Sequence, residues 1–263
     1  MPFGKSVLPL QCHIKVVHYY RLTKKAENKN KNIGIMLEIK DITFGYNSRK
    51  KVISGLSLTF TEGGVYGLLG KNGTGKSTLL YLIMGLLRPQ TGCVLMDGVD
   101  TKDRRPESMQ DMFIVPEEYD LPSVRLTDYI NTIKPFYPQF DEQTLKDCLE
   151  MFEMPYDVEL GDLSMGMKKK VYMCIALAAR TKVLLMDEPT NGLDIPSKSQ
   201  FRKVVARGMR EDQIIVISTH QVRDVETLVD HVTIIDDNRV LFNDKLNPEE
   251  PVNLEELFLI HNS

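Results

Sequence analysis

The sequence predicts an α/β fold with three parts: a mostly parallel sheet at its core, an antiparallel β subdomain beside it and an inserted α-helical subdomain. From Met36 onward, short apolar runs rich in β-branched residues alternate with stretches of helical periodicity. This alternation is typical of a parallel sheet wrapped by helices. The chain of 263 residues is 42% hydrophobic and 26% charged, which is the composition of an ordinary folded protein.

The strands fall into two groups. Four continuous apolar runs predict strands that are buried on both faces: Val65 to Leu69, Met112 to Val115, Val183 to Met186 and Ile214 to Ile217. Three other runs predict the antiparallel sheet: Leu37 to Ile39, Leu58 to Phe60 and Cys93 to Met96. Turns are expected at Gly63-Gly64 and at Asp97-Gly98.

The helical subdomain is expected at about residues 121–165, where strand patterns are replaced by helical spacing. Its apolar residues recur three or four positions apart: Leu126, Tyr129, Ile130, Ile133, and later Leu145, Leu149 and Phe152. Thr127 or Asp128 is the candidate start of a first helix, and Asp141 of a second, with Pro135 and Pro138 between them.

The charge is unevenly distributed. Residues 1–35 carry seven Lys or Arg and one acid, a net charge of +6, so the remainder carries −9 of the total of −3. We expect this extension to be a solvated, flexible segment, or to precede a true start at Met36; contact with anionic lipid or a partner is the alternative. The acidic body argues against a nucleic-acid partner.

No stretch of about 18 uninterrupted apolar residues and no secretory signal pattern occur, so a cytoplasmic location is expected.

A glycine-rich loop follows the apolar run that ends at Leu69 and precedes a helical stretch. Its residues are Gly70, Lys71, Asn72, Gly73, Thr74, Gly75, Lys76 and Ser77, with Thr78 next. The order of strand, loop and helix matches a phosphate-binding P-loop, whose backbone N–H groups surround phosphate oxygens. Lys76 is then expected to bind the β and γ phosphates of ATP, and the Ser77 hydroxyl to bind Mg²⁺. The sequence therefore predicts a P-loop NTPase core.

Two adjacent acids end another predicted strand. Asp187 and Glu188 follow Val183 to Met186, at the edge where a parallel sheet presents its ligand-binding residues. We expect Asp187 to hold the Mg²⁺ shell, and Glu188 to orient and deprotonate the water that attacks the γ phosphate.

These residues resemble the ABC transporter ATPases over essentially all of residues 36–263. The segment Leu163-Ser164-Met165-Gly166-Met167 resembles the Leu-Ser-Gly-Gly-Gln signature of that family. Asn191-Gly192-Leu193-Asp194 resembles its D-loop, and Ser218-Thr219-His220 resembles its switch histidine at a strand end. A segment at residues 136–141 and the short helical subdomain are similar to bacterial exporter-type ATPases with a single cassette.

The resemblance implies roles for further residues. Ser164 and Gly166 would contact the γ phosphate held by the opposite subunit, with the N-terminus of a helix at residues 168–180 helping to bind that anion. His220 would contact the γ phosphate as a catalytic residue beside Glu188 and Lys76. Tyr46 matches the aromatic residue that stacks on adenine.

Two departures from the family pattern bear on the site. Met165 and Met167 replace a glycine and the glutamine of the signature, whereas Ser164 and Gly166 are kept. Glu117 stands where the family usually has glutamine; its carboxylate could still be a ligand of Mg²⁺, but it adds negative charge beside the phosphates.

The resemblance predicts the ATP-hydrolysing subunit of an ABC transporter. It would work as a head-to-tail dimer, of identical or closely related subunits, around ATP and Mg²⁺, bound through a separate transmembrane permease to the cytoplasmic face of the membrane. Two alternatives stay open: a soluble ABC ATPase acting on ribosomes or DNA, and a regulatory protein that has lost hydrolysis. The sequence identifies neither the transported substance nor the direction of transport.

Overall fold

A computed structural model describes residues 36–47, 50–247, 249 and 252–262. The unit Gly34–Ser263 is compact in itself. The predicted basic extension, residues 1–35, lies outside the described residues and stays a prediction.

The central sheet has six strands in the order β10-β9-β3-β8-β7-β6. Their bounds are β3 Gly64–Leu69, β6 Met112–Val115, β7 Val183–Asp187, β8 Ile214–Thr219, β9 His231–Asp236 and β10 Arg239–Lys245. All neighbouring pairs are parallel except β9 with β10. The four predicted core strands lie side by side in this sheet, and the prediction of a mostly parallel core is confirmed.

A second, antiparallel sheet has the order β2-β1-β4-β5. Its strands are β1 Leu37–Phe44, β2 Ile53–Phe60, β4 Thr91–Met96 and β5 Val99–Asp100. The three runs predicted for this sheet lie in β1, β2 and β4, and the turn at Asp97-Gly98 joins β4 to β5 through residues with positive φ. The other predicted turn is misplaced by one residue, because Gly64 already begins β3, where its N–H donates to the Gln213 carbonyl.

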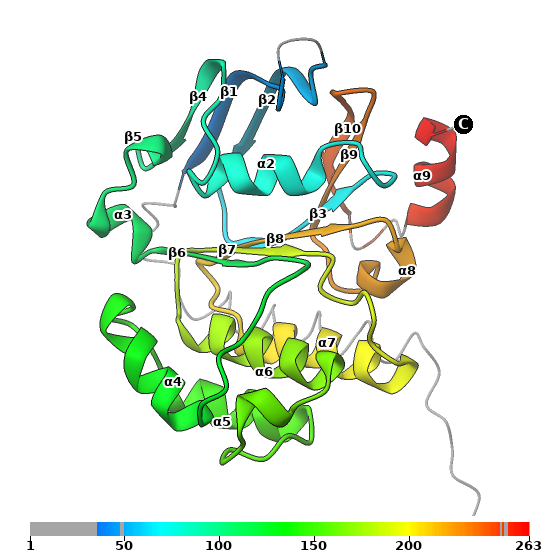
Figure 1. The fold of residues 1–263 in the computed structure, drawn as a ribbon. Coiled ribbons are helices and arrows are strands. Elements are labelled where there is room, and N and C mark those ends of the chain that lie inside the picture. Colours follow the sequence, from blue (N-terminus) through cyan, green and yellow to red (C-terminus); the bar gives the residue numbers. More distant parts are fainter. Residues whose placement is uncertain (1–35, 48–49, 248, 250–251, 263) are drawn as a thin grey trace, which may run out of the picture. The chain divides into compact units, whose positions relative to one another are not determined.

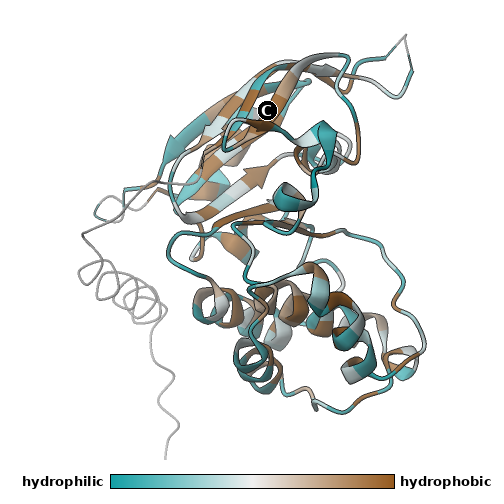
Figure 2. Cartoon of the chain, turned by 90° about the vertical axis from the view of Figure 1, so that its left-hand side faces the viewer, coloured by the Kyte–Doolittle hydropathy of each residue, from teal (hydrophilic) through white to brown (hydrophobic). Residues whose placement is uncertain are grey.

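Helix α2, Lys76–Ile83, lies between the two sheets (Figure 1). Its Leu79, Leu80, Leu82 and Ile83 are buried together with residues of both sheets. Helices α6 Met165–Ala178 and α7 Ile195–Gly208 lie on the other face of the central sheet, and α5 Glu142–Met151 packs against these two helices on their far side (Figure 1). A second apolar core forms among these helices and this face of the sheet. Brown, apolar segments are accordingly prominent in the strands and along the helices (Figure 2). This packing buries every residue of β3, β7 and β8, and their carboxyl ends carry the candidate site.

The helical region of the chain contains α4 Leu126–Ile133, η2 Lys134–Phe136, α5 and η3 Leu160–Asp162. Asp141 is the N-cap of α5, as expected, and accepts a hydrogen bond from the Gln143 N–H at 3.0 Å. The first helix begins earlier than predicted, because Arg125, in an extended conformation, occupies the N-cap position. That residues 121–165 form a separate subdomain stays a prediction.

The remaining short elements are η1 Thr101–Asp103, α3 Pro106–Met109, α8 Val222–Val225 and α9 Leu254–Asn262. Within the described part of the chain, no helix combines the length and apolar character needed to span a membrane.

Candidate functional site

The glycine-rich loop joins β3 to α2 and leaves the start of α2 open. Gly75 is the N-cap of α2, with a φ of 99° and no side-chain hydrogen bond to the first turn. This left-handed conformation favours glycine. Gly70 is required for a different reason: a Cβ there would lie 2.5 Å from the Ile235 carbonyl oxygen and 2.7 Å from Thr74 Oγ1. The uncapped N–H groups of α2 can therefore bind an anion.

Lys76 is a buried cation at the start of α2. Its Nζ donates to the carbonyl oxygens of Gly70 and Lys71, at 2.7 and 3.0 Å, and lies 3.7 Å from Glu188 Oε1. Only 6% of the residue is exposed. Burial lowers the pKa of Lys76, and the negative charge of Glu188 opposes this shift. Lys71, Asn72 and Gly73 are exposed beside it, and Thr74 Oγ1 donates to the Lys71 carbonyl at 2.9 Å.

Asp187 is buried at the end of β7, where it meets hydroxyl groups from two other elements. The Ser218 hydroxyl on β8 donates to Asp187 Oδ1, and the Ser77 hydroxyl on α2 is also hydrogen-bonded to this carboxylate. Burial raises the pKa of Asp187, whereas these two hydrogen bonds lower it. The arrangement gathers oxygen ligands of the kind that a hard cation such as Mg²⁺ prefers.

Glu188 follows Asp187 in a strained conformation and is held by residues at the end of β8. Its φ is 42°, and only 4% of the residue is exposed. Thr219 Oγ1 donates to Oε2 at 3.0 Å, while the His220 N–H and Nδ1 lie 3.1 and 2.9 Å from Oε1. Non-glycine residues in this backbone region cost about 1–3 kcal/mol and are concentrated at functional sites. The carboxylate is therefore fixed close to Lys76 at the edge of the sheet.

Glu117 lies after β6 and is joined to the segment that follows Glu188. Asn191 Nδ2 donates to Glu117 Oε1 at 2.8 Å. A further residue of this group, Lys169 of α6, was not predicted; its Nζ donates to the carbonyl oxygens of Glu188 and Asn191 at 3.1 and 3.0 Å. One signal could have found it: Lys169 shares a helical face with the apolar residues Met173 and Ala176.

The serine of the signature-like segment caps helix α6. Ser164 is its N-cap and its Oγ accepts a hydrogen bond from the Met167 N–H at 3.3 Å. The helix begins at Met165, three residues before the predicted start at 168, because Ser164, in an extended conformation, is already its N-cap. Ser164 is exposed and Gly166 half-buried, and a Cβ at Gly166 would lie 3.9 Å from the Gly192 carbonyl oxygen.

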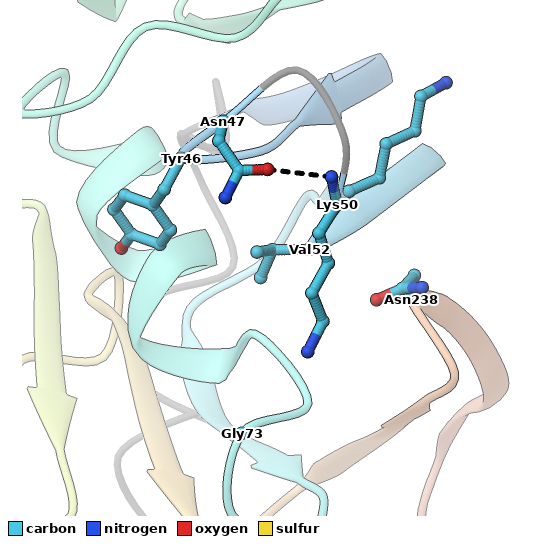
Figure 3. Close-up of a pocket in the computed structure, with 7 residues that line it drawn as sticks. Tyr46, Asn47, Lys50, Val52, Gly73 and Asn238 are labelled. Atoms are coloured by element: carbon cyan, nitrogen blue, oxygen red, sulfur yellow. Dashed lines mark hydrogen bonds between the residues drawn. The ribbon is translucent and has the colours of Figure 1, made fainter.

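Tyr46 lies beside α2, next to a cavity of about 240 Å³ (Figure 3). The cavity is lined by Tyr46, Asn47, Lys50, Lys51, Val52, Gly73 and Asn238. The Tyr46 hydroxyl and Thr78 Oγ1 are 3.2 Å apart, and the ring packs edge-on against Phe44 with centroids 5.1 Å apart. The side chain is otherwise open, with 65% of the residue exposed. Tyr46 and the phosphate loop therefore border one cavity.

Comparison with known proteins gives a consistent result. The family model described as "ABC transporter" matches residues 53–191. The chain is 31% identical over 221 residues to the ABC transporter ATP-binding protein NatA of Bacillus subtilis (strain 168), covering 80% of this chain and 90% of NatA. It is 29% identical over 207 residues to YtrB, another ABC transporter ATP-binding protein of that strain, covering 77% of this chain and 70% of YtrB.

Solved structures agree on the fold. An ATP-binding subunit of an ABC transporter matches with a TM-score of 0.76 at 24% identity, over 87% of this chain and all of that one. A bacterial Atm1-family ABC exporter with ATP bound matches with a TM-score of 0.72 at 19% identity, over 95% of this chain and 47% of the exporter.

Proposed function

The chain belongs to the ABC transporter family as an ATP-binding ATPase subunit, and we propose that Glu188 activates the water for hydrolysis at a site completed by a second subunit. The observation that carries this proposal is the fixed Glu188 carboxylate, which lies 3.7 Å from Lys76 and accepts hydrogen bonds from the residues that end β8.

Hydrolysis of ATP needs a base near the γ phosphate and positive charge on its oxygens. Lys76 and the open N-terminus of α2 supply the positive charge; Lys76 must then exchange its carbonyl partners, at Gly70 and Lys71, for phosphate oxygens. Glu188 orients and deprotonates the attacking water. His220 contacts the γ phosphate while its Nδ1, 2.9 Å from Glu188 Oε1, keeps the carboxylate in place.

We propose Ser77, Asp187 and Glu117 as the protein ligands for Mg²⁺. The fit rests on the chemistry of these donors, because a hydroxyl and two carboxylates provide the oxygen atoms that Mg²⁺ takes, in addition to phosphate and water. A bound Mg²⁺ would neutralise phosphate charge during hydrolysis. The buried Asp187 carboxylate already accepts hydroxyl hydrogen bonds and would exchange that of Ser77 for the metal.

We place the adenine on Tyr46, an exposed residue that lines the cavity beside Gly73 and whose ring lies over α2 (Figure 3). Aromatic rings bind adenine by stacking. Thr78, which now faces the Tyr46 hydroxyl, and the loop residues Lys71, Asn72 and Thr74 complete the nucleotide contacts.

A second ATPase subunit, identical or closely related, would complete each site with its Ser164 and Gly166. Ser164 lies at the exposed N-terminus of α6, where backbone N–H groups favour an anion. Two exposed apolar residues lie in the first turn of α6, Met165 and Met167, which are 69 and 37% exposed, and Ile195 at the start of α7 is 85% exposed. Exposed apolar residues of this size are typical of a surface that a partner covers.

The relatives favour a transporter over a soluble ATPase acting on ribosomes or DNA. We propose that a separate membrane permease is the partner and that the chain works at the cytoplasmic face of the membrane. The retained Lys76, Asp187, Glu188 and His220 favour an active ATPase over a regulatory protein without hydrolysis.

The experiment is Glu188→Gln, assayed by phosphate release and by size-exclusion chromatography with ATP. We expect ATP binding to persist, turnover to be lost and an ATP-dependent dimer to accumulate. Glu142→Gln is the matched control, because Glu142 is an exposed acid of α5 that pairs with Lys134; it should hydrolyse ATP as the wild type does. An unchanged ATPase rate in Glu188→Gln would show that Glu188 is not the base.

A further inference from the structure

Three acidic residues lie after β6 and at the end of β7, namely Glu117, Asp187 and Glu188, and the charges of Glu117 and Glu188 act on Asp187. Asp187 and Glu188 are expected from the resemblance to ABC ATPases, whereas Glu117 stands where that family usually has a neutral glutamine. Negative charges beside a phosphate-binding loop oppose the binding of ATP phosphates unless a cation offsets them. Burial, and then the charges of Glu117 and Glu188, raise the pKa of Asp187, so Glu117 acts on its neighbours.

Lys169 of α6 is a buried cation that contacts the backbone of Glu188. Only 5% of the residue is exposed, and both hydrogen bonds from its Nζ end on neutral backbone carbonyls, those of Glu188 and Asn191. Burial of an ammonium group is costly unless opposite charge or hydrogen bonds compensate it. Burial lowers the pKa of Lys169, and the charge of Glu117 is the largest of the effects that raise it, ahead of Glu188 and Asp187.

Asn191 connects this lysine to Glu117. Its carbonyl oxygen accepts from Lys169 Nζ at 3.0 Å, and its side-chain Nδ2 donates to Glu117 Oε1 at 2.8 Å. Lys169 is on the second turn of α6, the helix that Ser164 caps. A single side chain therefore ties the signature helix, the Asn191 segment and the backbone of Glu188 together.

The geometry points to Lys169 as a positioning residue for ATP hydrolysis, which fixes the Glu188 and Asn191 backbone and offsets the charge of Glu117. This inference rests on the proposed function of Glu188. It gives Glu117 and Lys169 a joint role: the chain keeps an additional acid beside the phosphates because a buried lysine balances it. Removal of the Lys169 charge should therefore lower ATP hydrolysis chiefly in proteins that keep Glu117.

The test measures ATP hydrolysis by wild type, Lys169→Gln, Glu117→Gln and the double variant, with kcat and KM determined separately at fixed Mg²⁺. Glutamine keeps a donor for the carbonyls but removes the charge. We expect Lys169→Gln to lower kcat/KM about tenfold, and Glu117→Gln in that background to restore it to within about threefold of wild type. Lys169→Arg, which keeps the charge, should remain more active than Lys169→Gln.

Neighbouring residues provide the matched controls. Lys170 is the next residue of α6 but faces Gln200, with its Nζ 3.4 Å from Gln200 Oε1, so Lys170→Gln should keep wild-type kcat/KM. Glu118→Gln should fail to rescue Lys169→Gln, because the acid that the Asn191 side chain bonds to is Glu117. Melting temperatures of all variants separate unfolding from an effect on the site.

Two results would overturn the inference: wild-type kinetics for Lys169→Gln, or a double variant as impaired as Lys169→Gln alone. If Lys169→Gln does not fold, a folded and active double variant supports the charge balance, and an unfolded double variant refutes it. Failure of the proposed function would be seen separately, as an active Glu188→Gln enzyme.

Discussion

The contact between Thr219 and Glu188 gives a quantitative test of how the base is held. Thr219→Val keeps the shape of a side chain that is fully buried, but removes the hydroxyl that donates to Glu188 Oε2 at 3.0 Å. It also removes the acceptor of the Gln221 N–H, 2.9 Å away. The substitution therefore leaves one oxygen of a buried carboxylate without this donor.

The expected magnitude follows from the charge on the acceptor. A hydrogen bond to a charged group contributes about 1.5–3 kcal/mol, and about 1.4 kcal/mol is a tenfold change in rate. Because His220 still holds Oε1, we expect the lower end of that range, a fall in kcat of about tenfold. KM should change by less than about threefold, since the phosphate loop keeps its own contacts.

The assay is steady-state phosphate release over a range of ATP concentrations, together with thermal unfolding. Thr233→Val is the matched control, because Thr233 is a buried threonine of β9 whose hydroxyl donates to Asn243 Oδ1 at 2.8 Å, on the β9–β10 hairpin. Both variants should melt a few degrees lower, but only Thr219→Val should lose kcat. Equal kcat values in the two variants would refute the argument that Thr219 positions Glu188.

Three further predictions concern other contacts. His220→Ala removes the Nδ1 contact with Glu188 and should lower kcat at least about tenfold in the same assay; unchanged kcat would contradict its role. Asp141→Ala should lose about 1 kcal/mol of unfolding free energy at pH 7 by denaturant titration. The hydrogen bond from Thr144 lowers the pKa of Asp141 below its ordinary 3.8. The cap therefore stabilises the protein fully above pH 3.8 and loses this effect as the pH falls through the lower pKa of the folded state. A stability difference between wild type and Asp141→Ala that grows on acidification would contradict this. Gly85→Ala should be more destabilising than Gly98→Ala. Both glycines have positive φ, but only at Gly85 would an added Cβ clash with a backbone oxygen, that of Thr101 at 2.2 Å. Equal melting temperatures of the two variants would refute this clash.

The positions of residues at strand ends were predictable, because each depends only on the apolar run that precedes it in the sequence. A run of apolar residues fixes a buried strand, and the polar residues after Leu69, Met186 and Ile217 must then lie at the same edge of a parallel sheet. This is why the phosphate loop, Asp187 and His220 could be expected near one another from the order of residues alone.

Contacts between distant segments were not predictable in this way. The pairing of Glu117 with Asn191 depends on where a side chain of one loop meets another loop, and neither has a periodic signal. Lys169 is the middle one of three consecutive lysines; its spacing to Met173 and Ala176 indicates that it is buried, but not which backbone carbonyls it contacts, because tertiary packing decides that. The positive φ of Glu188 likewise follows from hydrogen bonds to β8 rather than from its residue type.

The central claim, that two subunits share each site, is tested most directly by mixing two inactive proteins. Ser164→Arg damages the signature end of α6 but keeps the phosphate loop, and Lys76→Ala does the reverse. If each site combines the loop of one subunit with Ser164 and Gly166 of the other, a mixed dimer has one intact site and one doubly damaged site. ATPase activity should then rise on mixing well above that of either protein alone. A mixture that forms dimers but stays as inactive as its components would contradict the account.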